Sequence, residues 1–295
     1  MDSIEIGDVS VNRIEEFVHW AMPIDRYFPG TDEAAWLANR DWLEPDHWDA
    51  TSKRAHTVFH SWLIRSGGQN ILVDTGVGNG KLRPSMPDFS MRQTPYLQTL
   101  ESAGFRPDDI DLVICTHLHV DHVGWNTHDV DGEWVPTFPN ARYVFARPEV
   151  EFWDPGNEIR RRGEKVNENV FDDSVRPILD AGLADVWDGP SLTIDENLRL
   201  ELAPGHTPGL AVVKVQAGSD QAIFVNDILH SPMQVLDCAL NSCFCEDEAG
   251  SVETRKNVLG WAADNRALIF PAHFNGQHVF RAERRDGRFA IAEWI

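Results

Sequence analysis

Three histidines and one aspartate lie within six consecutive residues, as His117, His119, Asp121 and His122. They come directly after residues 111–115, an apolar run that is typical of a buried strand. In an extended chain His117 and His119 point the same way, whereas Asp121 and His122 follow in a turn and can reach a second point nearby. Without a metal, four titratable groups crowded here would carry a large desolvation cost. The segment therefore predicts a metal site with room for two ions.

The ligand types indicate which metals this site would hold. Imidazole and carboxylate suit zinc best, and iron, manganese, nickel and cobalt accept the same ligands. Three further candidates each follow a strand-like run: His206 in the glycine- and proline-rich loop 203–209, Asp227 after residues 222–226, and His273 after residues 267–272. Any one of them alone could instead cap a helix or a turn. Their joint occurrence favours a site with two metal ions.

These motifs together resemble those of the metallo-β-lactamase fold hydrolases, from about residue 56 to residue 295. The family pattern His-x-His-x-Asp-His, a Gly-His loop, a strand-end Asp and a strand-end His is matched at all seven positions. The resemblance implies one metal held by His117, His119 and His206, a second held by Asp121, His122 and His273, and a bridge formed by Asp227. Residues 73–76 resemble the family's first motif, whose aspartate, here Asp74, is an inner structural residue near the ligands.

The resemblance also implies a fold and a reaction. The fold is a four-layer αββα sandwich of the α/β (α+β) class, with the ligands at one edge between two sheets. Two divalent ions about 3.5–4 Å apart lower the pKa of a shared water and supply a bridging hydroxide as nucleophile. Asp121 is suited to orient that hydroxide and to carry a proton to the leaving group, in addition to its role as a ligand. Hydrolysis is the expected reaction.

His230, three positions after Asp227, is a further catalytic candidate. In many acyl-homoserine lactonases of this fold a tyrosine occupies that offset and assists the substrate carbonyl, whereas this chain has a histidine. The segment 226–232 is thereby closer to the branch that resembles methyl parathion hydrolase. We expect His230 to donate a hydrogen bond to the developing oxyanion, and a buried structural histidine is the alternative.

Charge and composition indicate which classes of binding partner this protein is unsuited to. The 295 residues include 26 Lys and Arg against 47 Asp and Glu, a formal net charge of −21. Such a surface repels phosphate groups, which argues against nucleic acid and against anionic membranes. Residues 1–8 have neither the basic nor the apolar region of a signal peptide, and no window approaches eighteen apolar residues. The sequence therefore predicts a cytoplasmic protein that acts on a small molecule.

The elements that must position these residues read as alternating strands and helices. We treat residues 1–295 as a single domain, without internal repeats. Strands are expected at residues 4–14, 58–64, 70–73, 112–115, 142–146, 198–202, 211–216 and 222–225, and helices at residues 96–103, 148–152 and 252–264.

Two segments read as insertions on this scaffold. Residues 18–50, an aromatic-rich N-terminal extension, include Trp20, Tyr27, Phe28, Trp36, Trp42 and Trp48. A lid or pocket wall for an apolar substrate, or a dimer contact, is one interpretation of this segment, and ordinary packing onto the core is the other. Residues 152–180 carry the basic run 160–162, which is typical of a solvated helix face and is otherwise suited to steering an anion.

The leading hypothesis is a dinuclear zinc hydrolase of a lactone or carboxylic ester. Its first alternative is phosphotriester hydrolysis in the manner of methyl parathion hydrolase, because a metal-activated hydroxide attacks either electrophile. A second alternative is a non-catalytic metal-binding module, against which the complete ligand set speaks. The identity of the substrate, the native metal and the oligomeric state, a homodimer included, stay open at this point.

Overall fold

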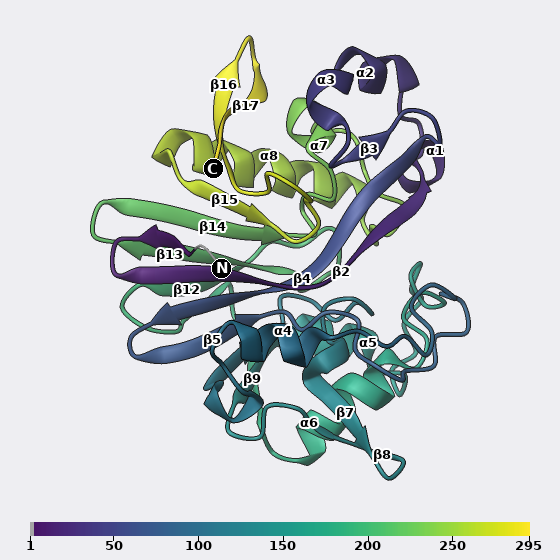
Figure 1. The fold of residues 1–295 in the computed structure, drawn as a ribbon, viewed down its shortest axis with the longest axis vertical. Coiled ribbons are helices and arrows are strands. Elements are labelled where there is room, and N and C mark those ends of the chain that lie inside the picture. The colour runs from purple at the N-terminus through teal and green to yellow at the C-terminus, as the bar shows by residue number, and fades with distance from the viewer. Residues whose placement is uncertain (1–2) are drawn as a thin grey trace.

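The computed structural model describes residues 3–295, apart from the side chains of residues 20 and 21. Two β-sheets pack face to face, and helices cover the outer face of each (Figure 1). Helices α4 (Tyr96–Ser102), α5 (Arg147–Trp153) and α6 (Arg176–Asp180) cover the first sheet, and α8 (Glu248–Asn265) covers the second. This arrangement confirms the four-layer αββα sandwich that the motifs imply.

The first sheet is built from the N-terminal part of the chain. Its strands are β1 (Ile4–Ile6), β2 (Val9–Pro23), β3 (Trp48–Asp49), β4 (Arg54–Ser66), β5 (Gln69–Val73), β6 (Leu112–Ile114), β9 (Arg142–Ala146) and β10 (Ala184–Trp187). They follow the order β1-β2-β4-β5-β6-β9-β10, with β3 paired to β4. The strands from β1 to β5 pair antiparallel, whereas β5, β6, β9 and β10 pair in parallel. The parallel strands therefore all end at the same edge of the sheet.

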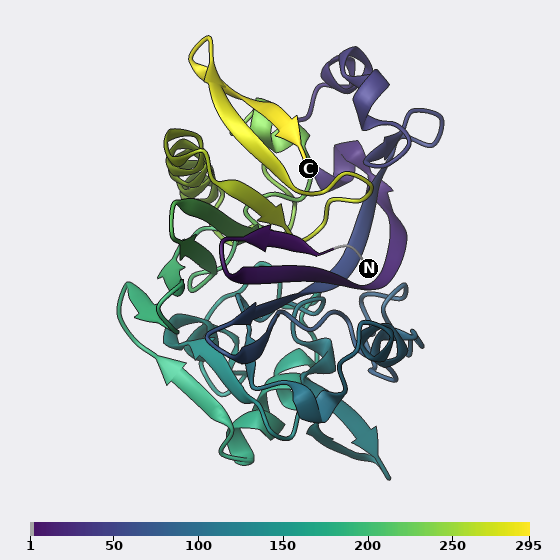
Figure 2. The same ribbon diagram turned by 60° about the vertical axis from the view of Figure 1, so that its left-hand side comes forward.

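The second sheet is built from the C-terminal part of the chain. Its strands are β11 (Ser191–Thr193), β12 (Leu198–Leu202), β13 (Ala211–Ala217), β14 (Asp220–Asn226), β15 (Leu268–Pro271), β16 (Phe280–Arg285) and β17 (Arg288–Trp294), paired in chain order. Only β14 and β15 pair in parallel among these strands. Figure 2 shows the hairpin of β16 and β17, in yellow, projecting beyond the body of the sheet.

The alternation of apolar side chains explains why both sheets lie inside the sandwich. In β5, Ile71 and Val73 face the second sheet, whereas Leu72 packs under the helices of the first layer. In β13, Val213 faces the first sheet and Val212 packs against α8. Successive side chains of a strand point to opposite faces, so each strand can support two cores.

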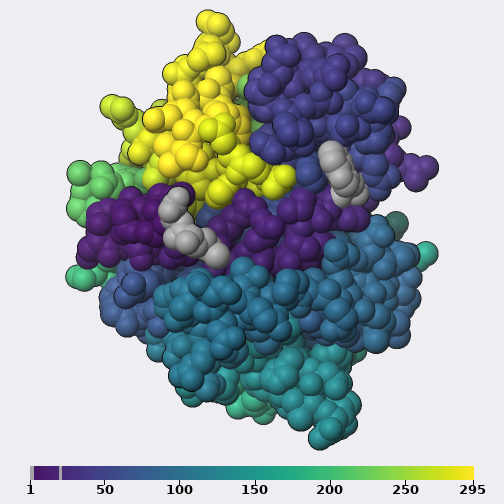
Figure 3. Space-filling view, viewed as in Figure 1, coloured from purple at the N-terminus to yellow at the C-terminus, as the bar shows by residue number. Residues whose placement is uncertain are grey.

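Within the N-terminal segment, residues 18–50, the part between β2 and β3 forms a small unit beside the sandwich. It contains α1 (Ile24–Tyr27), α2 (Glu33–Ala38) and α3 (Arg40–Leu43), and its buried aromatic residues pack together and against Met233. Figure 3 shows this segment lying against the C-terminal residues. The His47 ring stacks on the Trp294 ring there, with the ring centroids 5.7 Å apart. The side chain of Trp20, which the sequence groups with these aromatic residues, lies outside the described residues.

Several elements differ from the sequence expectations. Residues 4–14 divide into β1 and β2 at Gly7, whose φ of +58° favours glycine, and β2 then continues to Pro23. The first residues of the N-terminal segment therefore belong to the first sheet. The pattern does not predict the hairpin of β7 (Thr127–Val130) and β8 (Glu133–Pro136), nor α7 (Met233–Leu236). Throughout residues 3–295, no helix combines the length and apolar character needed to cross a membrane.

The second insertion, residues 152–180, uses its basic run to hold its own loop. The Arg161 guanidinium donates hydrogen bonds to the carbonyls of Asp154 and Asn157, at 2.8 and 3.1 Å. Arg162 pairs with Glu248 at 2.7 Å, across to the start of α8. Residues 160–162 lie in a loop, so the interpretation as a helix face is wrong, and the contacts of Arg161 and Arg162 favour a structural role for the run over the steering of an anion.

Candidate metal centre

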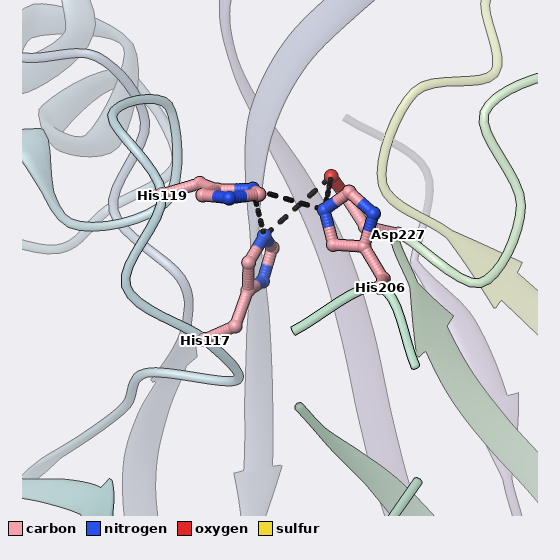
Figure 4. A group of neighbouring side chains, drawn as sticks. All are labelled: His117, His119, His206 and Asp227. Carbon is pink, nitrogen blue, oxygen red and sulfur yellow. Dashed lines mark hydrogen bonds and ion pairs between the residues drawn. The ribbon is translucent and has the colours of Figure 1, made fainter. Parts of the chain in front are cut away.

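The seven predicted ligands lie together at one edge of the sandwich, where strands of both sheets end. His117, His119, Asp121 and His122 lie in the loop after β6, His206 lies between β12 and β13, Asp227 follows β14, and His273 follows β15. We call these seven residues the ligand cluster. Figure 4 shows four of them, with the imidazoles of His117, His119 and His206 converging on the carboxylate of Asp227.

The first half of the ligand cluster consists of three imidazoles around one carboxylate oxygen. His119 Nδ1 lies 3.2 Å from His117 Nε2 and 2.9 Å from His206 Nε2. Asp227 Oδ2 lies 3.5 Å from His117 Nε2 and 3.2 Å from His206 Nε2. Four ligand atoms thus lie within 4.8 Å of one another, and all four residues are buried.

The second half lies on the other oxygen of the same carboxylate. Asp227 Oδ1 is 2.9 Å from His273 Nε2 and 3.2 Å from His122 Nε2. Asp121 Oδ2 completes this group, at 3.6 Å from each of the same two nitrogens. The carboxylate of Asp227 therefore presents one oxygen to each group of imidazoles, as a bridging ligand does.

The nitrogen on the far side of several imidazoles has a partner that fixes the orientation of the ring. His122 Nδ1 lies 2.8 Å from the Asp74 carboxylate, and His273 Nδ1 lies 3.1 Å from the Val58 carbonyl. His206 Nδ1 lies 3.7 Å from the Cys245 thiol. Such outer partners leave the remaining nitrogen of each ring pointing into the ligand cluster. Asp74, which the sequence places near the ligands, also accepts hydrogen bonds from the amide and hydroxyl of Thr116, both at 2.8 Å.

Burial and charge act against each other in the ligand cluster. Burial holds the pKa of His117 and of His119 well below the ordinary value. Burial also lowers the pKa of His122, but the neighbouring carboxylates, Asp227 first, outweigh it and hold that pKa well above the usual range. For Asp227 burial raises the pKa, and the surrounding imidazoles reverse this and hold it well below the usual range. The carboxylate is therefore ionised, which is the form that binds a cation.

The donor set fits divalent metal ions. His122 Nε2 and Asp227 Oδ1 are buried, and although they lie 3.2 Å apart, neither makes a hydrogen bond of good geometry within the described part of the chain. Buried polar atoms are normally satisfied, and the two atoms lie among the converging ligands. Imidazoles and carboxylates at these distances could form two adjoining sites for zinc, or for another metal that binds nitrogen and oxygen ligands.

Local backbone features position two of the ligands. In β14 and β15 the register pairs Phe224 with Phe270 and then Asn226 with Pro271, so Val225 is an extra residue in a β-bulge. Strict alternation would place Asp227 on the outer face with Ile223 and Val225, which pack against α8. The bulge, with Asn226 at a φ of +46°, turns Asp227 towards the ligand cluster instead.

The loop that carries His206 requires glycine at its turn. Gly205 has a φ of +140°, and a Cβ there would lie 2.4 Å from the amide nitrogen of Ser251. The carbonyls of this loop also accept hydrogen bonds from the residues just before α8, since the amides of Glu246 and Asp247 donate to His206 and Gly205, both at 2.9 Å. Only a residue without a side chain allows this close approach.

Glu149, on α5, joins two of the ligand-bearing loops. Its buried carboxylate accepts hydrogen bonds from the amides of Leu118 and Gly209, at 3.0 and 2.7 Å, and from the indole of Trp153 at 3.0 Å. Burial raises the pKa of Glu149, and these donors act in the opposite direction. The carboxylate thereby ties the loop of His117 and His119 to the loop of His206.

His230 lies beside the ligand cluster. Its Nε2 is 3.2 Å from Asp227 Oδ2, and Asp227, His230 and His273 form a further group of possible ligand atoms. Burial lowers the pKa of His230 to about 3, so the ring is neutral. Its Nδ1 is buried without a hydrogen-bond partner among the described residues, although a purely structural histidine normally satisfies both nitrogens.

A cavity of ≈120 Å³ opens onto the ligand cluster. His119, Asp121, Asp227, His230 and His273 lie along it. Apolar side chains from separate parts of the chain make much of the remaining wall: Met22, Phe59, Met86, Phe89, Val166 and Phe244. Polar and charged side chains make the other part: His19, Tyr27, Arg54, Thr57 and Asp88. The volume is below the roughly 300–1,000 Å³ of sites for drug-sized ligands, so it suits a small reactive group with a slender apolar part. A larger hollow of ≈1040 Å³ between α7, α8 and β17 contains no residue of the ligand cluster.

Sequence reasoning does not find several residues that contact the site. Glu149, Cys245 and Thr57 carry no local motif, because each contacts the site from a different element of the fold. Trp125, which the sequence places just after the ligand motif, donates to Glu16 at 2.7 Å and stacks on Tyr96. Trp125 therefore packs behind the loop and does not line the cavity.

Comparisons with known proteins address the same region of the chain. The family model of the metallo-beta-lactamase superfamily matches residues 60–273, which include the whole ligand cluster. N-acyl homoserine lactonase AiiB of Agrobacterium fabrum (strain C58) is 29% identical over 107 residues, 32% of this chain. Ribonuclease TTHA0252 of Thermus thermophilus is 34% identical over 62 residues, 21% of this chain. The chain spans only 37% of the first of these curated relatives and 11% of the second.

Solved structures match over nearly the whole chain. The dizinc quorum-quenching lactonase AidC, in complex with a product, has a TM-score of 0.79 at 22% identity, with 100% of this chain and 96% of that chain covered. The hydrolase AbOPH of the beta lactamase superfamily has a TM-score of 0.80 at 21% identity, with 99% and 96% covered. At this level of identity the likeness establishes the fold. Together with the family match, it shows that the chain belongs to the metallo-β-lactamase superfamily, a group of metallo-hydrolases.

Proposed function

We propose that this protein is a dinuclear metal-dependent hydrolase of lactones or carboxylic esters. The observation that carries the proposal is the placement of Asp227, whose two carboxylate oxygens face two separate groups of ligands. One group alone would serve a single ion. The proposal treats residues 1–295 as one domain, because residues from both halves of the chain meet in the ligand cluster.

The ligand roles follow from the two groups. We assign His117, His119 and His206 to one zinc ion, Asp121, His122 and His273 to the other, and Asp227 to both. Bound there, two divalent ions supply a hydroxide nucleophile at neutral pH and polarise the oxygen of the substrate carbonyl. Iron, manganese and cobalt accept the same ligands, and metal analysis decides among them.

Asp121 and His230 act on the substrate in this proposal. The side chain of Asp121 is 15% exposed, more than that of Asp227 at 4%, and it lines the cavity. Its carboxylate can therefore hold a proton and pass it to the leaving oxygen. The neutral imidazole of His230 also faces the cavity and donates a hydrogen bond to the oxygen on which charge develops.

The cavity supports an ester with an apolar part. Met22, Phe89 and Phe244 give its wall an apolar character, and an acyl chain is the portion of a lactone or ester that such a wall would cover. The likeness to proteins named as lactonases, AiiB and AidC, points the same way. Residues 18–50 contribute Met22 and Tyr27 to this wall, which favours the pocket-wall interpretation of that segment.

Phosphotriester hydrolysis is the second candidate function. It is favoured by His230, because the segment that carries it is similar to the methyl parathion hydrolase branch and lacks a tyrosine at that offset. A neutral imidazole at this place can donate to a phosphoryl oxygen as well as to a carbonyl oxygen.

One experiment tests these proposals together. Metal content is measured, and the metal-loaded protein is assayed on lactones, linear aryl esters and phosphotriesters, beside His119→Ala and the control His128→Ala, which replaces a histidine of β7 outside the ligand cluster. We expect two ions per chain, a preference for lactones, loss of metal and turnover in His119→Ala, and neither loss in His128→Ala. Two bound ions without turnover of any substrate would support the non-catalytic metal-binding module. Faster phosphotriester turnover would favour the second candidate.

A further inference from the structure

Tyr27 brings a phenol from the N-terminal segment to the ligand cluster. It ends α1 and is 4% exposed, and it lines the same cavity as Asp121, Asp227 and His230. Its ring meets the His230 imidazole edge to face, with centroids 5.8 Å apart. Tyr27 and His230 are far apart in sequence and adjacent in the fold.

The ring of Tyr27 is held on several sides. Phe28 stacks on it at 4.5 Å, and Phe244 contacts it edge to face at 5.8 Å. The carbonyl of Tyr27 accepts a hydrogen bond from the amide of Cys243 at 2.8 Å, which joins α1 to the loop after α7. A side chain packed in this way presents its hydroxyl in one orientation, which a hydrogen-bond donor in an active site requires.

Burial favours the protonated form of the Tyr27 phenol. Burial raises its pKa well above 10, and the negative charges of Asp227 and Asp121 raise it further. Tyr27 belongs to the buried cluster of the N-terminal segment and at the same time lines the cavity beside Asp121 and Asp227. A protonated phenol beside two anions can donate a hydrogen bond but is a poor source of a proton.

A second hydroxyl lies at the same side of the cavity. Thr57, on β4, is 2% exposed and lines the cavity, and its hydroxyl interacts with the Tyr27 phenol, which lowers the pKa of that phenol against the stronger effect of burial. Each hydroxyl has one donor and two acceptor sites, so two neighbouring hydroxyls can bond to each other and still donate to a bound oxygen atom. Two hydroxyls that line the cavity beside the ligand cluster are suited to donate to an oxygen of a ligand.

We propose that the Tyr27 phenol donates a hydrogen bond to the carbonyl or carboxylate oxygen of the bound substrate, with the Thr57 hydroxyl beside it, so that the N-terminal segment completes the active site. No bond is made or broken by this donation. The inference rests on the proposed ester hydrolysis and adds to it a residue that lies outside the ligand motifs.

The first test is Tyr27→Phe, which removes only the hydroxyl. In the metal-loaded protein we expect kcat/KM for lactones to fall on the order of 10²-fold, mainly through kcat, as on loss of one oxyanion donor. Metal content and thermal midpoint should match wild type, because Tyr27 is not a ligand. Tyr96→Phe is the matched control, since the Tyr96 hydroxyl bonds to Ser61 at 2.6 Å, away from the cavity. An unchanged kcat/KM in Tyr27→Phe, or loss of metal from it, would overturn the proposal.

A second readout does not depend on turnover. The chain has three tyrosines, so protein labelled with 3-fluorotyrosine gives three fluorine resonances, and Tyr27→Phe assigns one of them. Octanoate, a product-like carboxylate, should shift the Tyr27 resonance of the zinc-loaded protein and leave those of Tyr96 and Tyr143 in place. Tyr27→Phe should bind octanoate roughly tenfold more weakly, the loss expected for one hydrogen bond.

The two readouts separate this inference from the function on which it rests. If wild type hydrolyses lactones and Tyr27→Phe matches it in rate and in octanoate affinity, the role of Tyr27 is wrong and the hydrolase proposal stands. If wild type turns over none of the substrates but octanoate shifts Tyr27 and binds more weakly to the variant, the phenol still contacts a bound oxygen and the ester hydrolase proposal is wrong.

Discussion

The floor of the cavity is made of imidazoles and carboxylates from strand ends of both sheets, whereas part of its wall is made of Met22 and Tyr27 from the N-terminal segment. The imidazoles of the floor are oriented by outer partners such as Asp74 and the Val58 carbonyl. The wall is fixed mainly by apolar packing around α1 and by one backbone hydrogen bond. The floor therefore depends on charge and hydrogen bonding, and the wall depends on buried area, so the two should respond to different changes.

The largest effect is expected from Asp227→Asn, on the floor. The amide keeps the shape of the side chain but removes the charge that faces both groups of imidazoles. Loss of several kcal/mol of charge stabilisation should lower kcat/KM by on the order of 10³-fold and reduce the bound metal. Steady-state kinetics and elemental analysis measure both. Asp220→Asn, at the exposed start of the same strand, is the control and should change neither.

Asp74→Asn should have a smaller effect on the floor. It weakens the partner that orients the His122 ring but leaves every ligand in place. We expect metal affinity to fall by about 10–100-fold, as for other outer partners of ligands. Competition with a chromogenic chelator measures this change. The fluorine resonance of Tyr27 should stay where it is in wild type, and a shift there would show that floor and wall are not independent.

The wall should respond to acid through His47, in the N-terminal segment. Burial lowers the pKa of His47 to about 3, and the nearby His56 and His278 lower it further, whereas an unfolded histidine titrates near 6.5. The unfolded state therefore binds more protons between pH 6.5 and pH 3, so stability is present above pH 6.5 and falls as the pH drops through this window. At pH 5 the loss approaches about 2 kcal/mol.

Thermal unfolding at pH 7 and pH 5 checks this expectation. His47→Phe keeps an aromatic ring against Trp294 and removes the titrating group. The drop in midpoint between pH 7 and pH 5 should be smaller in the variant than in wild type. Equal drops in the two proteins would show that His47 does not set the acid sensitivity of the N-terminal segment.

The smallest effect is expected from Met22→Ala, on the wall. Met22 is half-buried and lines the cavity, so its loss removes a few methylene contacts from an acyl chain. KM for long-chain esters should rise by about tenfold or less, with little change for acetyl esters and none in metal content. Met91→Ala, at a methionine that is 59% exposed, is the matched control. A loss of metal in Met22→Ala would contradict the separation of wall from floor.

The residues of the floor could be predicted from the sequence because they lie in recognisable local motifs. Four of the ligands lie in one short segment, and the other three each follow an apolar run that forms a strand. The αββα fold was predictable for a similar reason, because the alternation of apolar residues in β5 and β13 can be seen in the sequence, and the structure confirms this fold. Distances between the ligands required the structure, because the bulge at Asn226 decides where Asp227 points.

The wall could not be predicted to the same degree. The aromatic residues of the N-terminal segment are visible in the sequence, but Trp36 and Trp48 pack inside the segment whereas Tyr27 faces the ligand cluster. The local sequence pattern does not distinguish an aromatic residue that packs inside the segment from one that lines the cavity, because the contact between Tyr27 and His230 joins residues that are distant in the chain. Glu149 was equally hidden, since its three donors come from two loops and its own helix.

The position of His273 late in the sequence affects when the ligand cluster can form during synthesis and folding. This residue follows β15, which pairs in parallel with β14. Its backbone carbonyl accepts a hydrogen bond from the Val58 amide of β4, and its Nδ1 lies 3.1 Å from the Val58 carbonyl. A chain emerging from the ribosome therefore contains His117, His119, His206 and Asp227 before it contains the residue that completes the second group. The two halves of the ligand cluster become available in a fixed temporal order during synthesis, and Asp227 faces the complete second group only when the C-terminal strands have joined the sheet.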